Sequence, residues 1–210
     1  MVDQNDFRLY KSYLAHYGVK GMHWGIRRYQ NPDGSLTTAG KVHYTNDINT
    51  GDDELDNLLK LERKELPATY LKASMKNFTY DSSNHKLRSP KETAKMKTGN
   101  CHDQVLYELD QLKKGGRDAK AKFLIEVDSK TGQGGQTHSY VYYKDGKEFV
   151  WFENAWEDQK GEHRYNSEKE LHDDVKKKFR ANTSMDKIYD GDFKAKPGDT
   201  LQDIVNKSLK

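Results

Sequence analysis

The stretch HSYVYYKDGKEFVWFE, residues 138–153, decides the fold prediction for this chain. It holds two runs rich in aromatic and β-branched residues, HSYVYY (138–143) and EFVWFE (148–153), and such runs are typical of strands. Asp145-Gly146 between them is a strong signal for a tight hairpin turn. Because both faces of these strands are apolar, we expect them in the middle of an antiparallel sheet, next to a third strand at KAKFLIEVDS (120–129).

Helical patterns lie on both sides of this strand region. Apolar residues recur at helical spacing, and cap signals such as Ser89-Pro90-Glu92 mark where helices begin. The expected helices start near residues 52, 68, 89, 100, 167 and 200, and DKIYDGDF (186–193) predicts one more strand. Helices, then an antiparallel sheet, then helices predict an α+β fold.

The composition limits the classes of protein to consider. The chain has 210 residues and a net charge of only +3, from 36 basic and 33 acidic residues, so we expect no nucleic-acid partner. A single cysteine excludes an internal disulfide, and a reducing compartment is the simpler expectation. The sequence shows neither the apolar core of a signal peptide nor a run of about 20 apolar residues, so we expect no membrane partner.

The first 50 residues differ from the rest of the chain. Glycines at 18, 21, 25, 34 and 40 are separated by aromatic residues, and no helix or strand period persists. We therefore divide the chain into a glycine-rich N-terminal segment, 1–50, and a folded domain, 51–210.

The lone cysteine lies in TGNCHDQV, residues 98–105. Asn100 is a good N-cap, which puts Cys101 in the first turn of a helix whose buried stripe includes Val105 and Leu112. Unpaired N–H groups and the helix dipole at that position favour a thiolate, the nucleophilic form of cysteine. Cys101 is thus a candidate nucleophile.

A cysteine nucleophile needs an imidazole and a third group that orients it. If Asp145 and Gly146 are the central turn residues, His138 lies directly opposite Glu153, with Cβ atoms roughly 4.5–5.5 Å apart. A bulge would instead bring Asn154 opposite His138, and an amide is also chemically adequate. The sequence favours Cys101, His138 and Glu153 as the catalytic residues and leaves Asn154 open.

Several neighbouring residues have alternative interpretations. Zinc could be held by Cys101, His102, His138 and Glu153, but no CxxC or HxxxH spacing supports this, so we expect neither metal nor cofactor. Asp103 should stabilise the helix start, and Gln104 either polarises a carbonyl in the cleft or is an exposed helix residue. Trp151 and Trp156 should line the cleft or the core.

The motifs SPKETAKMKTGNCHDQ, THSYVYY and FVWFENAW resemble the transglutaminase-like superfamily of cysteine enzymes over roughly residues 85–180. The resemblance implies a papain-like fold with Cys101, His138 and a third acidic or amide residue. Better-known members have Asp at the third position, whereas the nearest carboxylate here is Glu153. The implied activity is thiol-dependent acyl transfer on a protein or peptide amide, as a protease, amidase or transglutaminase-like enzyme.

The segment HYGVKGMHWGIRRYQNPDGSLTTAGKVHY is similar to a short segment of proteins encoded by tailed phages and prophages of Gram-positive bacteria. This implies a phage or prophage product that is present in the bacterial cytoplasm or in the virion, and His16 and His23 are expected to have no catalytic role. The alternative function is that of a non-catalytic phage structural or binding protein on an inherited transglutaminase-like fold. A cleft that joins Cys101 and His138 would favour the enzyme.

Overall fold

The computed structural model describes residue 48 and residues 53–209. The chain divides between Asn57 and Leu58 into two units, and the sheet and the helices that pack on it belong to the second. The glycine-rich segment 1–50, with His16 and His23, lies outside the described residues except for Ile48.

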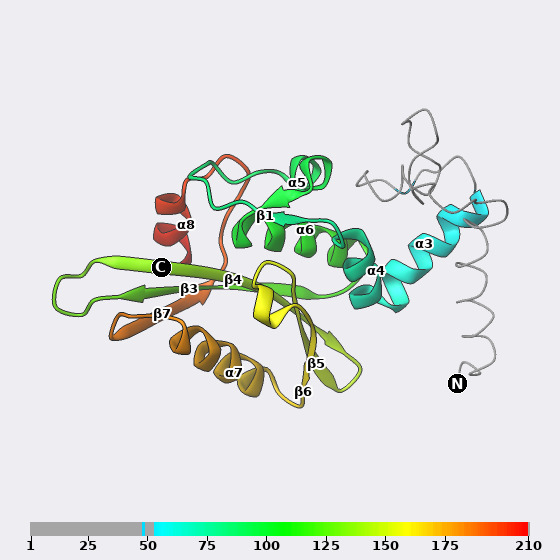
Figure 1. Ribbon diagram of the computed structural model, residues 1–210. Coiled ribbons are helices and arrows are strands. Elements are labelled where there is room, and N and C mark those ends of the chain that lie inside the picture. Colours follow the sequence, from blue (N-terminus) through cyan, green and yellow to red (C-terminus); the bar gives the residue numbers. More distant parts are fainter. Residues whose placement is uncertain (1–47, 49–52, 210) are drawn as a thin grey trace. The chain divides into compact units, whose positions relative to one another are not determined.

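A five-stranded sheet with only antiparallel pairs organises the second unit (Figure 1). Its order is β6 (Gly161–Tyr165), β5 (Glu148–Glu153), β4 (Gly134–Asp145), β3 (Ala119–Val127) and β7 (Lys187–Asp192). The three strands with apolar residues on both faces are the central ones, as predicted. The edge strand β6 was not predicted, because its sequence GEHRY is polar and lacks the apolar content of its neighbours.

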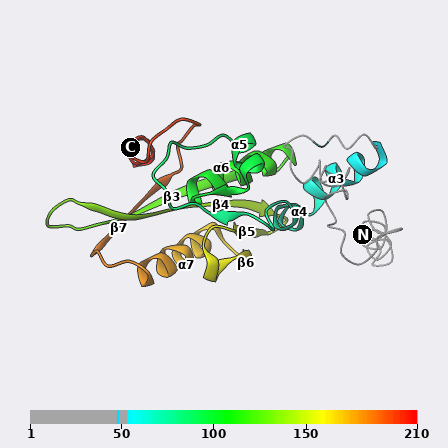
Figure 2. The same ribbon diagram turned by 45° about the horizontal axis from the view of Figure 1, so that its top comes forward.

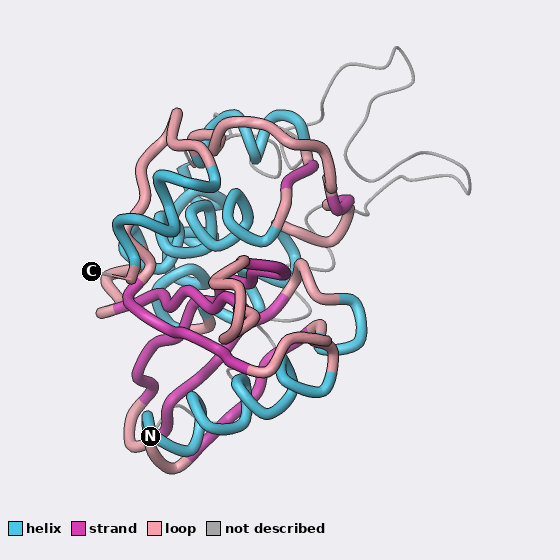
Figure 3. The backbone as a smooth tube through the Cα atoms, turned by 90° about the vertical axis from the view of Figure 1, so that its left-hand side faces the viewer, coloured by secondary structure: helices cyan, strands magenta, loops and turns pink. Residues whose placement is uncertain are grey.

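Helices cover both faces of this sheet (Figures 1 and 2). One face carries α6 (Cys101–Lys114) and the other carries α7 (Glu168–Ala181). The strands lie between these two layers in the end view of Figure 3. The remaining described elements are α3 (Asp53–Glu65), α4 (Pro67–Ser74), α5 (Pro90–Met96), α8 (Leu201–Ser208), a 3-10 turn (Glu157–Gln159) and a short parallel pair, β1 (Thr79–Tyr80) with β2 (Thr98–Gly99). The α+β prediction is confirmed.

The side chains of the central strands alternate between two apolar layers. Val141 and Tyr143 of β4 belong to the core under α6, together with Val105 and Leu112 of that helix. Tyr140 and Tyr142 of β4 and Trp151 of β5 belong to the core on the α7 side. The α7 residues of that core are Leu171, Val175 and Phe179. This alternation requires a fixed register, because a slip of one residue would exchange the two faces.

The hairpin register differs from the prediction by two residues. Asp145 pairs with Glu148, so the central turn residues are Gly146 and Lys147, not Asp145 and Gly146. Gly146 has a φ of 61°, which a residue with a Cβ rarely adopts and which suits glycine at the first central position of a primed turn. Because the shift is even, His138 and Glu153 stay on the same face as diagonal neighbours rather than opposite partners.

Two of the predicted helix starts, at Ser89 and Thr200, are confirmed by individual hydrogen bonds. Ser89 accepts the N–H of Glu92 while the Glu92 carboxylate accepts the N–H of Ser89, a complete capping box. Thr200 and Asp203 form the same arrangement at α8. Such caps satisfy N–H groups that the helix itself leaves open, so local sequence alone determines them.

Candidate active site

Cys101 is the first residue of α6 and is buried. The Asn100 side chain accepts the N–H groups of His102 at 3.0 Å and Asp103 at 3.1 Å, while the Asp103 carboxylate accepts the N–H of Asn100 at 3.1 Å. This capping box uses the N–H groups of the residues on either side of Cys101 and does not use the N–H of Cys101 itself. The thiol therefore lies at the positive end of a 14-residue helix.

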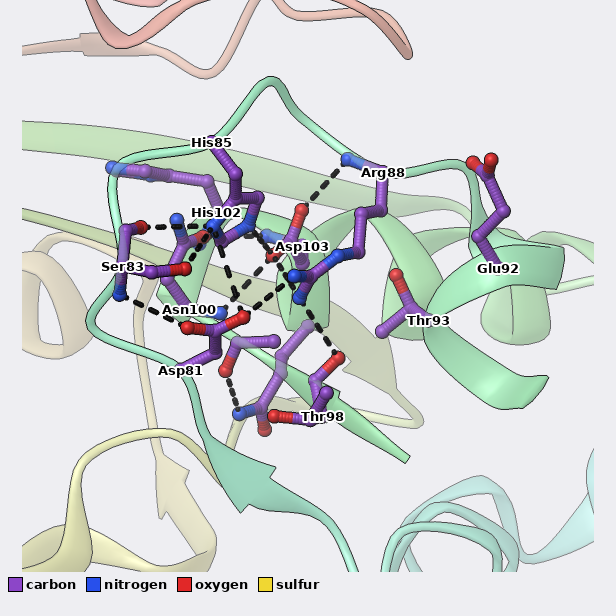
Figure 4. A network of polar contacts seen from close by, with 12 residues as sticks. Asp81, Ser83, His85, Arg88, Glu92, Thr93, Thr98, Asn100, His102 and Asp103 are labelled. Atoms are coloured by element: carbon purple, nitrogen blue, oxygen red, sulfur yellow. Dashed lines mark hydrogen bonds and ion pairs between the residues drawn. The ribbon is translucent and has the colours of Figure 1, made fainter. Parts of the chain in front are cut away.

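The carboxylate of Asp103 also fixes the loop that precedes α5 (Figure 4). It is fully buried and accepts the N–H of Arg88 at 2.8 Å and a hydrogen bond from His85 Nε2 at 2.6 Å. The predicted role of Asp103 at the helix start is confirmed, and its hold on this loop is an addition. Asp103, two residues after Cys101, thus links the start of α6 to the loop that precedes α5.

His138 and Glu153 form a buried pair next to this helix start. The distance from His138 Nε2 to Glu153 Oε2 is 3.0 Å, and both side chains are almost fully buried. The other carboxylate oxygen, Oε1, accepts the N–H groups of Ala155 at 2.8 Å and Trp156 at 2.9 Å. With three hydrogen bonds to its two oxygens, the Glu153 side chain is fixed in a position that orients the imidazole.

Aromatic rings enclose the His138 imidazole. Trp156 meets it edge-on with ring centroids 5.2 Å apart, and Tyr140 and Phe179 stack on it at 6.3 and 6.4 Å. Trp151 lies in the core, whereas Trp156 lines the cavity beside His138, so the two tryptophans divide the roles that the sequence left open. The enclosure lowers the exposure of the His138–Glu153 pair to solvent on the side of the rings, which strengthens their attraction.

The electrostatics of the site favour an ionised thiol. Burial disfavours the thiolate, but the imidazoles of His102 and His138 outweigh it and hold the pKa of Cys101 well below its usual value. Burial likewise opposes the charged form of His138, yet the Glu153 carboxylate and the Cys101 sulfur raise its pKa to about 10. A thiolate–imidazolium pair is the state that these effects stabilise.

His102 is the second imidazole at the thiol, with Nδ1 3.8 Å from Cys101 Sγ. Its two ring nitrogens are also in hydrogen-bond contact with Ser139 Oγ at 2.8 Å and Thr137 Oγ1 at 3.2 Å. Within the described part of the chain, no group of three or more His, Cys, Asp or Glu side chains is arranged to hold a metal ion. His102 contacts hydroxyl groups, whereas His138 has the carboxylate partner that a general base needs.

Two cavities meet at Cys101. One, of about 350 Å³, is lined by His138, Gln136 and Trp156. The other, of about 610 Å³, lies between the loop at residues 80–87 and the start of α8 at residues 199–204. Both are lined by Tyr80, Cys101 and Thr137. Cys101 therefore borders two cavities that extend away from it along different parts of the fold.

Both interpretations of Gln104 are wrong. The side chain is only 1% exposed, donates to the carbonyl of Gly99 at 2.8 Å and accepts from Asn154 Nδ2 at 2.7 Å. A glutamine used at both ends of its amide neither points into a cleft nor lies on the surface. The same contact places the Asn154 side chain against Gln104 of α6. Glu153, not Asn154, lies within hydrogen-bond distance of His138.

Two residues at the site were not found from the sequence. Glu108 lies two turns after Cys101 on the buried face of α6, and burial together with the nearby Glu153 charge raises its pKa well above the usual value. Tyr80 reaches the site only through the pairing of β1 with β2, which brings it beside Gly99. The helical spacing from Cys101 could have indicated Glu108, but a two-residue strand gives no comparable signal for Tyr80.

The N-terminal segment is similar to a known family. Residues 10–31 match a family of unknown function, DUF7211. No curated protein matches the chain. Among the helices of the described residues, none is at once long enough and apolar enough to cross a membrane.

Proposed function

We propose that this chain is a thiol-dependent acyl-transfer enzyme. The observation that carries the proposal is the buried His138–Glu153 pair, 3.0 Å apart, at a cavity that Cys101 also lines from the start of α6. A buried imidazole–carboxylate pair beside a thiol of lowered pKa is the arrangement that nucleophilic cysteine catalysis requires. The cleft that joins Cys101 and His138 favours the enzyme over a non-catalytic particle protein.

In the proposed reaction, Cys101 and His138 carry out the bond changes. The Cys101 thiolate attacks the carbonyl carbon of an amide, forming the C–S bond while the carbonyl π electrons move to oxygen. The His138 imidazolium then protonates the leaving amine as the C–N bond breaks, which leaves a thioester on Cys101 and a neutral imidazole. Water, deprotonated by His138, attacks the thioester carbon. The C–S bond then breaks, which releases the carboxylic acid and regenerates the Cys101 thiolate and the His138 imidazolium.

Glu153 and the backbone of Cys101 assist these steps without changing covalently. Glu153 holds the Nε2–H of His138 and stabilises the imidazolium. The Cys101 N–H, which is not used by the Asn100–Asp103 capping box, is available to the oxygen that becomes negative in the tetrahedral intermediate.

The finer parts of the proposal come from the resemblance of residues 85–180. They are a papain-like, transglutaminase-like fold, a protein or peptide amide as substrate, and an origin as a phage or prophage product of the bacterial cytoplasm or the virion. The α6-on-sheet packing, with cysteine on the helix and histidine and acid on adjacent strands, supports the fold assignment. Hydrolysis is preferred to cross-linking because no feature of the site marks a binding position for a second amine.

Labelling with a thiol-reactive acyl probe tests the proposal. The full chain should be acylated near neutral pH at Cys101, as located by mass spectrometry, while a folded Cys101→Ala variant should not. Incubation of both proteins with host lysate, followed by mass spectrometry, would then seek the substrate. A native chain that resists acylation would instead indicate the non-catalytic particle protein.

A further inference from the structure

The oxyanion that forms when the sulfur attacks a carbonyl needs more hydrogen-bond donors than the Cys101 N–H alone. Acyl-transfer sites stabilise the negative oxygen with two or more hydrogen-bond donors that are in place before the reaction. The Cys101 N–H supplies one of them in the proposed function, and the inference below rests on that function. The second donor must lie where the carbonyl is attacked, which is where the two cavities meet.

Three residues line both cavities: Tyr80, Cys101 and Thr137. The Thr137 hydroxyl is in hydrogen-bond contact with His102 Nε2, and the Thr137 carbonyl oxygen is an acceptor 4.0 Å from Cys101 Sγ. Neither group of Thr137 is suited to receive an oxyanion. The amide of Gln104, the donor suggested by the sequence, is used by Gly99 and Asn154. The hydroxyl of the third residue, Tyr80, is engaged by Cys101 itself, through its sulfur and its backbone N–H, and so lies at the reacting atoms.

The fold holds Tyr80 against the start of α6 through backbone pairing. Tyr80 pairs with Gly99, two residues before the nucleophile, and the N–H of Asp81 donates to the Gly99 carbonyl at 3.2 Å. The ring is 56% exposed and so forms a wall of the open cleft rather than part of the core. Partial burial, the negative charge of Cys101 and a hydrogen bond to the Cys101 sulfur raise the pKa of the Tyr80 hydroxyl, against the lowering effect of a hydrogen bond from the Cys101 backbone N–H. The hydroxyl therefore keeps its proton at neutral pH and lies at the sulfur and the N–H that the reaction uses.

We propose that Tyr80 is a catalytic residue whose hydroxyl, together with the Cys101 N–H, stabilises the oxyanion of the tetrahedral intermediate. The hydroxyl donates a hydrogen bond and keeps its proton throughout. The C–S bond forms, the carbonyl π electrons become the oxyanion lone pair, and these electrons re-form the carbonyl as the leaving group departs.

Two reactions of the same thiol separate this role from others. p-Nitrophenyl acetate acylates Cys101 through an oxyanion, with p-nitrophenolate as the leaving group, whereas iodoacetamide alkylates it by direct displacement with no oxyanion. Both rates are measured on the full chain for the native protein, Tyr80→Phe and Tyr189→Phe, a control at a half-exposed tyrosine of the edge strand β7. Cys101→Ala supplies the background for acylation elsewhere.

Tyr80→Phe should lower the acylation rate by about 10- to 100-fold and leave the alkylation rate within about threefold, because only acylation loses a donor. Tyr189→Phe should change neither rate. An unchanged acylation rate in Tyr80→Phe, or an equal fall in both rates, would overturn the assignment. If the native chain is alkylated but acylated no faster than Cys101→Ala, the proposed function itself fails, an outcome that does not depend on Tyr80.

Discussion

Replacing Glu153 by glutamine removes the charge from the buried pair and keeps the shape of the side chain. The native carboxylate serves three donors: His138 Nε2 at Oε2, and the N–H groups of Ala155 and Trp156 at Oε1. An amide has a single oxygen, so it cannot accept on both sides. We expect the glutamine oxygen to accept the N–H groups of Ala155 and Trp156, because that orientation keeps two hydrogen bonds and the reverse keeps one. The NH₂ group of the glutamine then faces His138.

This orientation reverses the protonation pattern of the imidazole. Nε2 must then accept from the amide, so the proton moves to Nδ1, the ring nitrogen left for Cys101, and the ring can no longer act as a base there. The same tautomer error costs about 10⁴-fold in a serine-protease triad. We expect acylation of Cys101 to fall by about 10²- to 10⁴-fold, and the free energy of unfolding by about 1–3 kcal/mol from imperfect pairing.

The assay is the burst of p-nitrophenolate from p-nitrophenyl acetate, corrected with Cys101→Ala, together with urea unfolding of each variant. Glu148→Gln is the matched control on the same strand. Its carboxylate pairs with Arg164 at 2.8 Å on the surface, and such pairs contribute only about 0–1 kcal/mol. A folded Glu153→Gln variant that keeps its acylation rate within about threefold of native would refute the assignment of Glu153 as the orienting group.

Three further predictions concern the ionisation of Cys101, the role of Asn154 and the packing at Gly191. The rate at which iodoacetamide alkylates Cys101 should change little between about pH 8 and pH 6, because the lowered thiol pKa keeps the sulfur ionised. The alkylation rate of glutathione, whose thiol pKa is about 8.5–9, should fall by about 100-fold over the same range. An equal fall in the rate for Cys101 would contradict the thiolate state. Asn154→Ala removes the bond to Gln104 and should keep the acylation burst within about fivefold of native; a loss as large as that of Glu153→Gln would return Asn154 to the catalytic set. Gly191→Ala should lower the free energy of unfolding by about 2–4 kcal/mol, because the added Cβ would overlap the carbonyl oxygen of Ser208 at the end of α8; an unchanged urea midpoint would contradict this contact.

Local signals made most of the fold predictable. The caps at Ser89, Asn100 and Thr200 depend on residues three apart in sequence. Both partners of each cap are therefore visible in a short stretch of sequence. The three central strands were recognisable because both of their faces are apolar. The edge strand β6 was missed because its residues face solvent on one side and its pairing with β5 supplies what its composition lacks.

The site shows where sequence reasoning ends. The turn residues were misassigned by one position, since either Asp145-Gly146 or Gly146-Lys147 can form a tight turn and tertiary packing selects between them. His138 and Glu153 nevertheless come together, because an error of two residues preserves the face of the strand. Tyr80 and the buried bonds of Gln104 depend on contacts between distant segments, which no local pattern encodes.

The buried Asp103 carboxylate has a consequence for how this site can diversify. It holds the loop before α5 by the backbone of Arg88 and the ring of His85, and it holds the start of α6 by the backbone of Asn100. The exposed side chains of Ser82 and Asn84, just before His85 in the same loop, line the larger cavity and make none of these contacts with Asp103. Substitutions at these two positions can therefore alter which molecules the cleft admits while the sulfur keeps its position. Under the proposed function, selection can then change the substrate and keep the same catalytic residues.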